Sequence, residues 1–187
     1  MRIIAGSLRG RALTAVGKGD PAAHLRPTTD RVRESLFNML AGGRFGAPFE
    51  SATVLDLFAG TGALGLEAVS RGAAQVTFVD DGRKALSLLR DNIRLLDAAG
   101  QCKIIARDAT RLPPCDGPAA TLIFLDPPYG QGLGLRALQA AVAGGWVAPD
   151  ALVVWEENAP QPPLTGFHLL DSRRYGETHV TMLRASA

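Results

Sequence analysis

From about residue 52 onward, short apolar runs alternate with segments whose apolar residues fall at helical spacing. Strands that alternate with helices predict a parallel sheet with helices on both of its faces. In such a sheet, ligands bind beyond the carboxyl ends of the strands. The alternation therefore predicts an α/β fold, and it also predicts the edge of the sheet at which a site should lie.

The expected elements follow from these periodicities. We expect strands over residues 53–58, 75–79, 103–106, 121–125 and 151–155. Helices are expected over residues 63–71, 83–98 and 133–143. Before the sheet, residues 1–15 resemble a short twisted hairpin, and a helix capped by Thr29 or Asp30 should end at Gly42-Gly43. We therefore divide the chain into an N-terminal hairpin and helix extension, residues 1–44, and a larger domain, residues 45–187.

Composition excludes several classes of protein. The longest apolar runs, such as residues 122–125, are far shorter than the ~18–20 residues of a membrane helix, and residues 1–6 begin no signal sequence. Two cysteines, Cys102 and Cys115, cannot build a disulfide scaffold or a four-thiolate zinc site. The three histidines lack helical metal-ligand spacing. We expect a cytoplasmic protein without a metal and without membrane contact.

Charge is distributed unevenly along the chain. The net charge is +2, but residues 1–44 hold eight Lys and Arg against three Asp and Glu. A basic segment on a mildly acidic body suggests a polyanionic partner, although incidental surface arginines would give the same count. The arginines that we expect to contact nucleic acid are Arg2, Arg9, Arg11, Arg26, Arg31 and Arg33, and some of the last three could line a cofactor pocket instead.

A glycine turn follows the first strand of the expected sheet. Gly60, Gly62 and Gly65 match the pattern G-x-G-x-x-G, and Asp80 lies twenty residues beyond Gly60. This is the fingerprint of dinucleotide-binding sheets. Related nucleoside sites need the same features, because the turn must be tight, the backbone must approach the ligand and an acid must accept ribose hydroxyls. The pattern alone does not choose between these ligands.

Two aspartates favour S-adenosylmethionine (SAM) over a dinucleotide. Asp56 lies at the strand end, where a carboxylate would repel a pyrophosphate but suits the ammonium group of SAM, directly or through water. Asp108 can accept the adenine amino group, or it can be a helix N-cap or turn residue. Asp80 suits the ribose, with Asp81 as the alternative. The expected cofactor-binding set is Asp56, Phe58, Gly60, Thr61, Gly62, Asp80, Asp108 and Ala109.

The tetrad Asp126-Pro127-Pro128-Tyr129 follows the fourth strand. Two prolines end a strand in any protein, but an acid and an aromatic residue that flank them at this edge indicate a site. The prolines fix the backbone, so the Pro127 carbonyl and the Asp126 carboxylate can both accept N–H bonds from one amine. Tyr129 offers a flat face for an unstacked base.

This arrangement suits methylation of an exocyclic amine on a nucleobase. Two acceptors favour a pyramidal nitrogen and aim its lone pair at a sulfonium methyl group. An ordinary aspartate with a pKa of ~3.9 does not deprotonate a neutral amine. Asp126 therefore holds the amine and stabilises the developing cation. Methylation at a carbon would need a cysteine nucleophile, and Cys115 precedes the fourth strand instead of ending it.

These residues resemble the RsmD family of bacterial methyltransferases. The resemblance covers the whole chain in order and rests on residues 2–11, 26–38, 56–62, 126–129 and 175–178. It implies a class I, Rossmann-like SAM-dependent methyltransferase fold with a seven-stranded sheet whose last strand is antiparallel. It also implies methyl transfer to the N2 amine of a guanine in 16S ribosomal RNA, within the 30S subunit or a late precursor.

Three other functions remain as alternatives. A DNA adenine-N6 methyltransferase shares the tetrad, but it should carry a target-recognition insertion for which 187 residues leave little room. A nucleotide-binding oxidoreductase would use the glycine turn and leaves the tetrad unexplained. A non-catalytic RNA-binding assembly factor would have no use for intact SAM-binding residues.

Overall fold

The computed structural model describes residues 1–14, 30–162 and 164–187. Its centre is a seven-stranded sheet with the order β3-β2-β1-β4-β5-β7-β6. Strands β1 to β5 are parallel, and β7 is antiparallel to both of its neighbours, which confirms the expected sheet. The strands are β1 Thr53–Leu57, β2 Gln75–Asp80, β3 Cys102–Ala106, β4 Ala120–Leu125, β5 Val147–Glu157, β6 Phe167–Tyr175 and β7 Thr178–Ala185.

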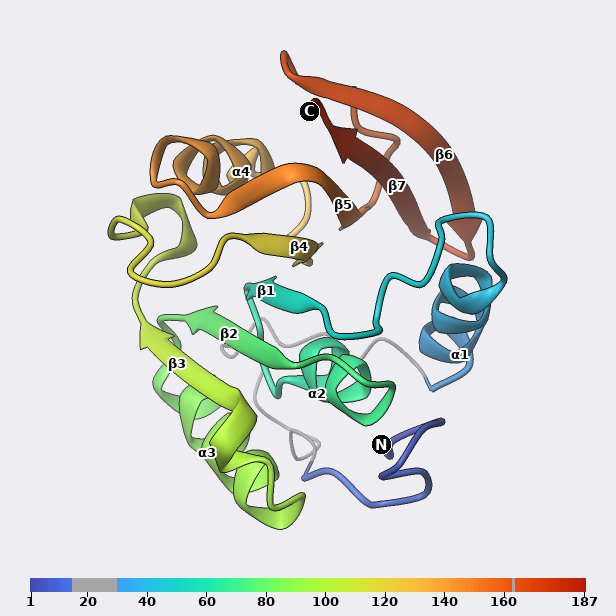
Figure 1. Cartoon of the computed structure of the whole chain (residues 1–187), viewed down its shortest axis with the longest axis vertical. Helices are drawn as coiled ribbons and strands as arrows, with labels where there is room; N and C mark the ends of the chain where they lie inside the picture. The colour runs from blue at the N-terminus through green and yellow to red at the C-terminus, as the bar shows by residue number, and fades with distance from the viewer. Residues whose placement is uncertain (15–29, 163) are drawn as a thin grey trace.

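Helices cover both faces of this sheet. Figure 1 shows α4 on one side and α1, α2 and α3 on the other. The helices are α1 Asp30–Ala41, α2 Ala63–Ser70, α3 Arg83–Leu95 and α4 Leu133–Ala143, with short 3₁₀ turns η2 Ala99–Gln101 and η3 Ala109–Arg111. Within the described ranges, no helix has the length and apolar character needed to cross a bilayer.

The expected elements are all present, with shifted ends. Strand β1 stops at Leu57 because Phe58 has a left-handed φ of 61°, which breaks the ladder. Helix α3 ends at Leu95, three residues early, and β5 is longer than its apolar run. Helix α1 begins at Asp30 and stops before Gly42, as expected, whereas Thr29, the other proposed cap, lies outside the described residues.

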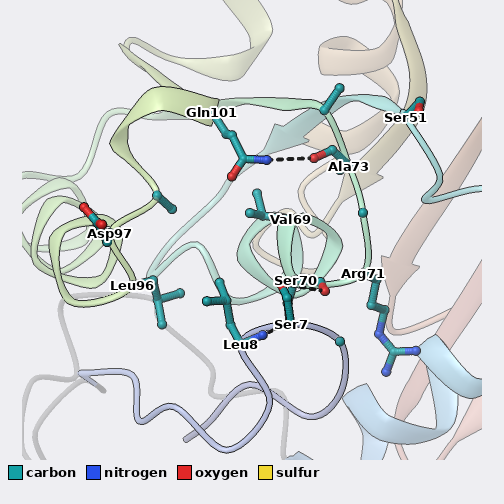
Figure 2. Close-up of a pocket in the computed structure, with 14 residues that line it drawn as sticks. Ser7, Leu8, Ser51, Val69, Ser70, Arg71, Ala73, Leu96, Asp97 and Gln101 are labelled. Atoms are coloured by element: carbon teal, nitrogen blue, oxygen red, sulfur yellow. Dashed lines mark hydrogen bonds between the residues drawn. The ribbon is translucent and has the colours of Figure 1, made fainter.

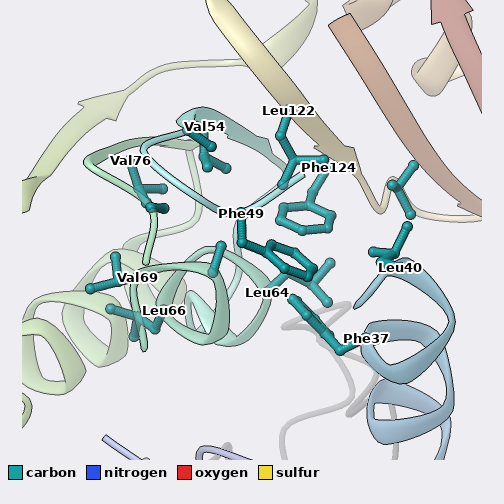
Figure 3. Close-up of a cluster of buried hydrophobic side chains, with 14 of the residues drawn as sticks. Phe37, Leu40, Phe49, Val54, Leu64, Leu66, Val69, Val76, Leu122 and Phe124 are labelled. Atoms are coloured by element: carbon teal, nitrogen blue, oxygen red, sulfur yellow. The ribbon is translucent and has the colours of Figure 1, made fainter. Parts of the chain in front are cut away.

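Alternating strand residues divide the core into two clusters, as expected for a sheet that is buried on both faces. Val54, Phe78 and Phe124 face α1, α2 and α3, whereas Leu57 and Leu125 face α4. Figure 3 shows the first cluster, in which Phe37 of α1, Phe49 and Phe124 gather. The Phe37 ring centroid lies 5.3 Å from that of Phe49 and 5.6 Å from that of Phe124.

Residues 1–14, which we call the N-terminal arm, fold back on themselves. Arg2 and Ala12 form an antiparallel bridge, and Gly10 N donates to Ile3 O at 2.9 Å. Ile3 and Leu13 are buried in the same cluster as the α1 side chains and the sheet. The boundary expected near residue 44 therefore does not separate two hydrophobic cores.

The arm is anchored on the last turn of α2. The buried Glu67 carboxylate accepts the backbone N–H groups of Ile4 at 2.7 Å and Ala5 at 3.0 Å. Ser70 Oγ accepts the N–H of Leu8 at 2.9 Å and donates to the Ala5 carbonyl at 2.5 Å. A charged acceptor makes stronger hydrogen bonds than a neutral one. These contacts use the backbone of the arm, and its arginine side chains are exposed, although Arg11 also donates to the carbonyl of Leu95.

A second anchor joins the end of the arm to the glycine turn. The Asn92 side chain of α3 is fully buried and accepts the N–H of Thr14 at 2.7 Å. Its amide nitrogen donates to the carbonyls of Thr14 at 3.2 Å and Thr61 at 2.9 Å. One side chain thus connects the arm with the turn that follows β1.

A matched pair of glycine substitutions tests the docking of the arm. Gly6 and Gly10 have similar φ angles of 85° and 82°, but only at Gly6 would a Cβ overlap the carbonyl oxygen of Ser70. Gly10→Ala should lower the free energy of unfolding by about 1 kcal/mol, the cost of a left-handed alanine. Gly6→Ala should lower it by at least about 2 kcal/mol, because it also displaces the arm. Urea unfolding measures both values, and equal losses would contradict the docking contact.

Candidate active site at the carboxyl edge of the sheet

Strand register brings three of the expected carboxylates together. Leu57 pairs with Val79 on one side and with Leu125 on the other, so Asp80 and Asp126 follow at the same edge. Asp56 precedes Leu57 on the central strand. Burial raises the pKa of Asp56 well above its ordinary value, and repulsion from Asp126 and Asp80 raises it further. The three carboxylates are therefore close enough to interact.

The Asp56 carboxylate is directed toward the start of α2. Its Oδ2 accepts the N–H of Gly65 at 2.9 Å, and the side chain is 1% exposed. Gly62, the N-cap of α2, provides no side-chain cap, so Asp56 satisfies one of the free N–H groups of the first turn. A contact between Asp56 and the ammonium group of SAM stays a prediction.

The glycines of the turn are required by packing as well as by backbone conformation. Gly60 and Gly62 have φ angles of 56° and 80°. A Cβ at Gly62 would overlap Leu89 of α3, and a Cβ at Gly65 would overlap Phe78 of β2. The turn therefore lies close against α3 and β2, and both Gly60 and Gly62 are buried.

Asp80 connects the turn to the start of α3. Its Oδ2 accepts the N–H of Gly60 at 2.8 Å, and its Oδ1 accepts the N–H of Gly82 at 2.8 Å. Burial raises the pKa of Asp80, although these two hydrogen bonds act in the opposite direction. Each carboxylate oxygen can accept a further bond, so ribose hydroxyls can still be held. Asp81, the alternative, is exposed.

Asp108 adopts the turn role that was left open for it. Its Oδ1 accepts the backbone N–H and the hydroxyl of Thr110, both at 2.8 Å, and it caps η3. Partial burial alone would raise the pKa of Asp108, but these hydrogen bonds hold it below the ordinary value. The carboxylate is therefore ionised and fixed, and acceptance of an adenine amine stays a prediction. Ala109 is buried, so its side chain packs in the core.

Hydrogen bonds connect the tetrad and the residue after it to strands β5 and β7. Asp126 is half-buried and Pro127 is buried, and the Tyr129 hydroxyl lies 3.2 Å from Thr178 Oγ1. The next residue, Gly130, donates its N–H to the Glu157 carboxylate at 3.2 and 3.3 Å. Glu157 was not expected from the sequence to take part in the site. The signal that was available is its position as an acid at the carboxyl end of a strand, like Asp80.

The structure separates the candidate RNA-binding arginines. Four of them have exposed side chains, Arg2, Arg9, Arg11 and Arg31. Arg33 is 1% exposed and donates to the carbonyl of Arg2, so it does not present its guanidinium to a phosphate. This corrects the phosphate contact expected for Arg33, whereas the alternative, a place in the cofactor pocket, stays a prediction. It precedes Leu36 and Phe37 by three and four residues on α1, which places it on the buried face of that helix. Arg26 lies outside the described residues.

The acceptors at this edge fit SAM better than a dinucleotide. Burial is the main cause of the raised pKa of Asp56, but the added repulsion from Asp126 and Asp80 marks a negative potential, which favours a cationic ligand and opposes a pyrophosphate. Asp80 can accept hydroxyl donors from a ribose. Among the residues with described placement, no group of three or more His, Cys, Asp or Glu side chains could hold a metal ion.

Two other hollows lie away from this edge. One of about 640 Å³ lies between the last turn of α2 and the end of α3, and Figure 2 shows that its polar side chains include Ser70 and Gln101. Both make structural contacts, Ser70 with the arm and Gln101 with the Ala73 carbonyl at 3.1 Å. Cys115 borders another hollow with Thr53 and Ala120, where β1 and β4 begin. Cys115 is therefore at the opposite edge from Asp126.

Comparison with known proteins gives consistent results. The family model described as conserved hypothetical protein 95 matches residues 1–184. Ribosomal RNA small subunit methyltransferase D of Escherichia coli (strain K12) is 39% identical over 156 residues, which are 83% of this chain and 74% of that protein. The protein of the same name from Haemophilus influenzae is 35% identical over 169 residues, 88% of this chain and 82% of that protein.

Solved structures show the same likeness. The structure of the putative methyltransferase YhhF from Escherichia coli has a TM-score of 0.81 and is 34% identical. The match covers 100% of this chain and 98% of that chain. TrmN from Thermus thermophilus has a TM-score of 0.64 at 28% identity over 87% of this chain and 51% of its own. With the observed strand order, these neighbours confirm the class I, Rossmann-like methyltransferase fold. From its match to the family model over nearly its whole length and its identity with these relatives, the chain belongs to the RsmD family.

Proposed function

We propose that this protein transfers a methyl group from SAM to the exocyclic N2 amine of a guanine in 16S ribosomal RNA, in the 30S subunit or a late precursor. The observation that carries the proposal is the Asp-Pro-Pro-Tyr tetrad at the end of β4, beside the carboxylates of β1 and β2. Relatives named as ribosomal RNA small subunit methyltransferases support the RNA substrate. Such a substrate implies a cytoplasmic location.

The cofactor is assigned to the glycine turn and the strand ends around it. Bound SAM supplies an electrophilic methyl group on a positively charged sulfur. Asp80 accepts the ribose hydroxyls, Asp108 accepts the adenine amine, and Asp56 provides negative charge near the ammonium group. The turn residues Phe58, Gly60, Thr61 and Gly62, together with Ala109, complete the assigned site.

Asp126 and the Pro127 carbonyl hold the amine of the target base. Bound SAM would supply the methyl carbon to the amine nitrogen that these two acceptors hold, and its sulfur would keep the electron pair of the broken carbon–sulfur bond. The nitrogen then releases one proton, which we assign to the Asp126 carboxylate. Tyr129 provides the face on which the unstacked base rests. Pro128 fixes the backbone between them.

The exposed arginines of the arm and of α1 are assigned to RNA phosphates. The exposed arginines available for this role are Arg2, Arg9, Arg11 and Arg31. Arg26 lies outside the described residues, and its RNA contact stays a prediction from the sequence. We propose that residues 1–44 form an extension that faces the RNA. The alternatives are less well supported, because these relatives are named as ribosomal RNA methyltransferases and an oxidoreductase would not need the tetrad.

Substitution of Asp80 tests the cofactor site. Asp80→Ala should weaken SAM binding by about 2–3 kcal/mol, since it removes a charged acceptor of ribose hydroxyls. Asp81→Ala is the matched control, because Asp81 is the exposed neighbour and should leave the affinity unchanged. Titration calorimetry measures both. A loss confined to Asp81→Ala would transfer the ribose role to that residue.

The pH dependence of binding tests the charge of the site. Asp56 and Asp80 have raised pKa values, so part of the negative charge is lost on acidification below these values. A cationic ligand binds best when the carboxylates are ionised. The preference for SAM over S-adenosylhomocysteine, which lacks the sulfonium charge, should therefore rise as the pH rises through the raised pKa values and then level off. The chosen range begins at the ordinary aspartate pKa of ~3.9, above which a raised pKa should be visible. A preference for SAM that does not change between pH 4 and pH 8 would contradict this assignment.

Asp126→Ala tests the chemical step. Loss of one preorganised acceptor should slow single-turnover methyl transfer to 30S particles by roughly a hundred- to a thousandfold, about 3–4 kcal/mol. SAM affinity should be unchanged, because Asp80 and the turn remain. Asp126→Asn should be milder, since its amide oxygen still accepts one N–H. Asp116→Ala, at the opposite edge, is the control. Full activity of folded Asp126→Ala would mean that the amine is held elsewhere.

A further inference from the structure

A third hollow lies beside Tyr129 of the tetrad. It has a volume of about 370 Å³ and is lined by Tyr129, Asn158, Arg174, Glu177 and His179. These residues come from the loop after β4, the end of β5 and the β6–β7 hairpin. Of these five residues, only Tyr129 has a role in the proposed methyl transfer.

Strand register fixes this hollow against the tetrad. Arg174 of β6 pairs with His179 of β7, and His179 pairs with Glu157 of β5. The buried Glu157 carboxylate accepts the N–H of Asn158 at 2.8 Å and that of Gly130, the residue after Tyr129. The Tyr129 hydroxyl meets Thr178 on the hairpin at 3.2 Å. The walls of the hollow and the tyrosine ring are therefore parts of one connected unit.

Two neighbouring arginines on β6 differ in their charge balance. The Nε of Arg173 lies 2.9 Å from Asp171 Oδ2. Partial burial alone would raise the pKa of Asp171, but Arg173, with the Ser172 N–H and Arg44, holds it below its ordinary value. Arg173 is thus paired with an acid on its own strand, which it shares with Arg44.

Arg174 is not neutralised in this way. Its Nε donates to the Gly176 carbonyl at 2.7 Å, and within the described part of the chain no carboxylate lies at ion-pair distance from it. A guanidinium carries five N–H donors, and this contact uses one of them. The contact orients the side chain and leaves its charge for an anion. The imidazole of His179, across the ladder, is a second donor.

A phosphate beside Tyr129 is what an unstacked base requires. A base that is taken out of its stack brings its own backbone phosphate with it, so a site that binds the base on an aromatic face needs an anion site nearby. The hollow also contains Asn158 and Glu177, which suit the amide and amine groups of a base edge. A nucleotide presents both an anion and such donors.

We propose that this hollow binds the backbone phosphate of the target nucleotide or its immediate neighbour, with Arg174 and His179 as the donors. The inference rests on the proposed RNA substrate. It assigns to the β6–β7 hairpin a role in holding RNA, separate from the arginines of the N-terminal arm.

Arg174→Gln and Arg173→Gln form a matched pair for the test. Both remove one positive charge from β6, but only the first removes a donor from the hollow. Binding to 30S particles from cells that lack the modification is measured across salt concentrations, with SAM affinity and methyl transfer alongside. Arg174→Gln should reduce the slope of log Kd against log salt by about 1 and raise KM for 30S particles roughly tenfold, with kcat and SAM affinity unchanged. Arg173→Gln should behave like the wild type, and Arg174→Lys should restore the salt slope.

The outcomes separate this inference from the proposed function. Equal behaviour of Arg174→Gln and Arg173→Gln, in a wild type that methylates 30S particles, would overturn the phosphate site and leave the function standing. A fall in kcat with an unchanged salt slope would also overturn it, since Arg174 would then act through the loop that carries Tyr129. A wild type that neither binds nor methylates 30S particles would overturn both.

Discussion

Strand β1 lies between β2 and β4, and its last residue, Leu57, is in register with Val79 and Leu125. The positions of Asp80 and Asp126 depend on that double register, because each follows directly after a paired residue. A slip of one residue in a ladder would turn every side chain of the strand to the opposite face. Two separate apolar clusters, one on each face, make such a slip costly.

Helix α2 serves the site and the arm together. Its first turn is capped by the Asp56 carboxylate at Gly65, and its last turn holds the arm through Glu67 and Ser70. The helix is only eight residues long and is buried over most of its length. It is therefore a short, rigid connection between the proposed cofactor site and the surface that carries the exposed arginines Arg9 and Arg11.

The sequence predicts the sheet, because apolar runs and helical spacing are local patterns, and it predicts the edge where the carboxylates meet. It does not predict where a carboxylate points. The orientation of Asp56 depends on how α2 packs on β1, and the contact of Glu157 with Gly130 depends on a loop from another strand. The error at Arg33 came from counting charge along the chain without asking which face of α1 each arginine occupies. The β6–β7 hairpin was expected only from the family resemblance.

The arm's contacts also bear on the order in which the chain acquires its structure during synthesis. Ile4 and Glu67 are separated by 63 residues, and Thr14 and Asn92 by 78. A chain is made from its N-terminal end, and contacts so distant in sequence form only after the intervening chain has been produced and closed into a loop. The arm is thus translated before α2 and α3, on which its docking depends. Until α2 and α3 have been made, the contacts that dock the arm cannot form.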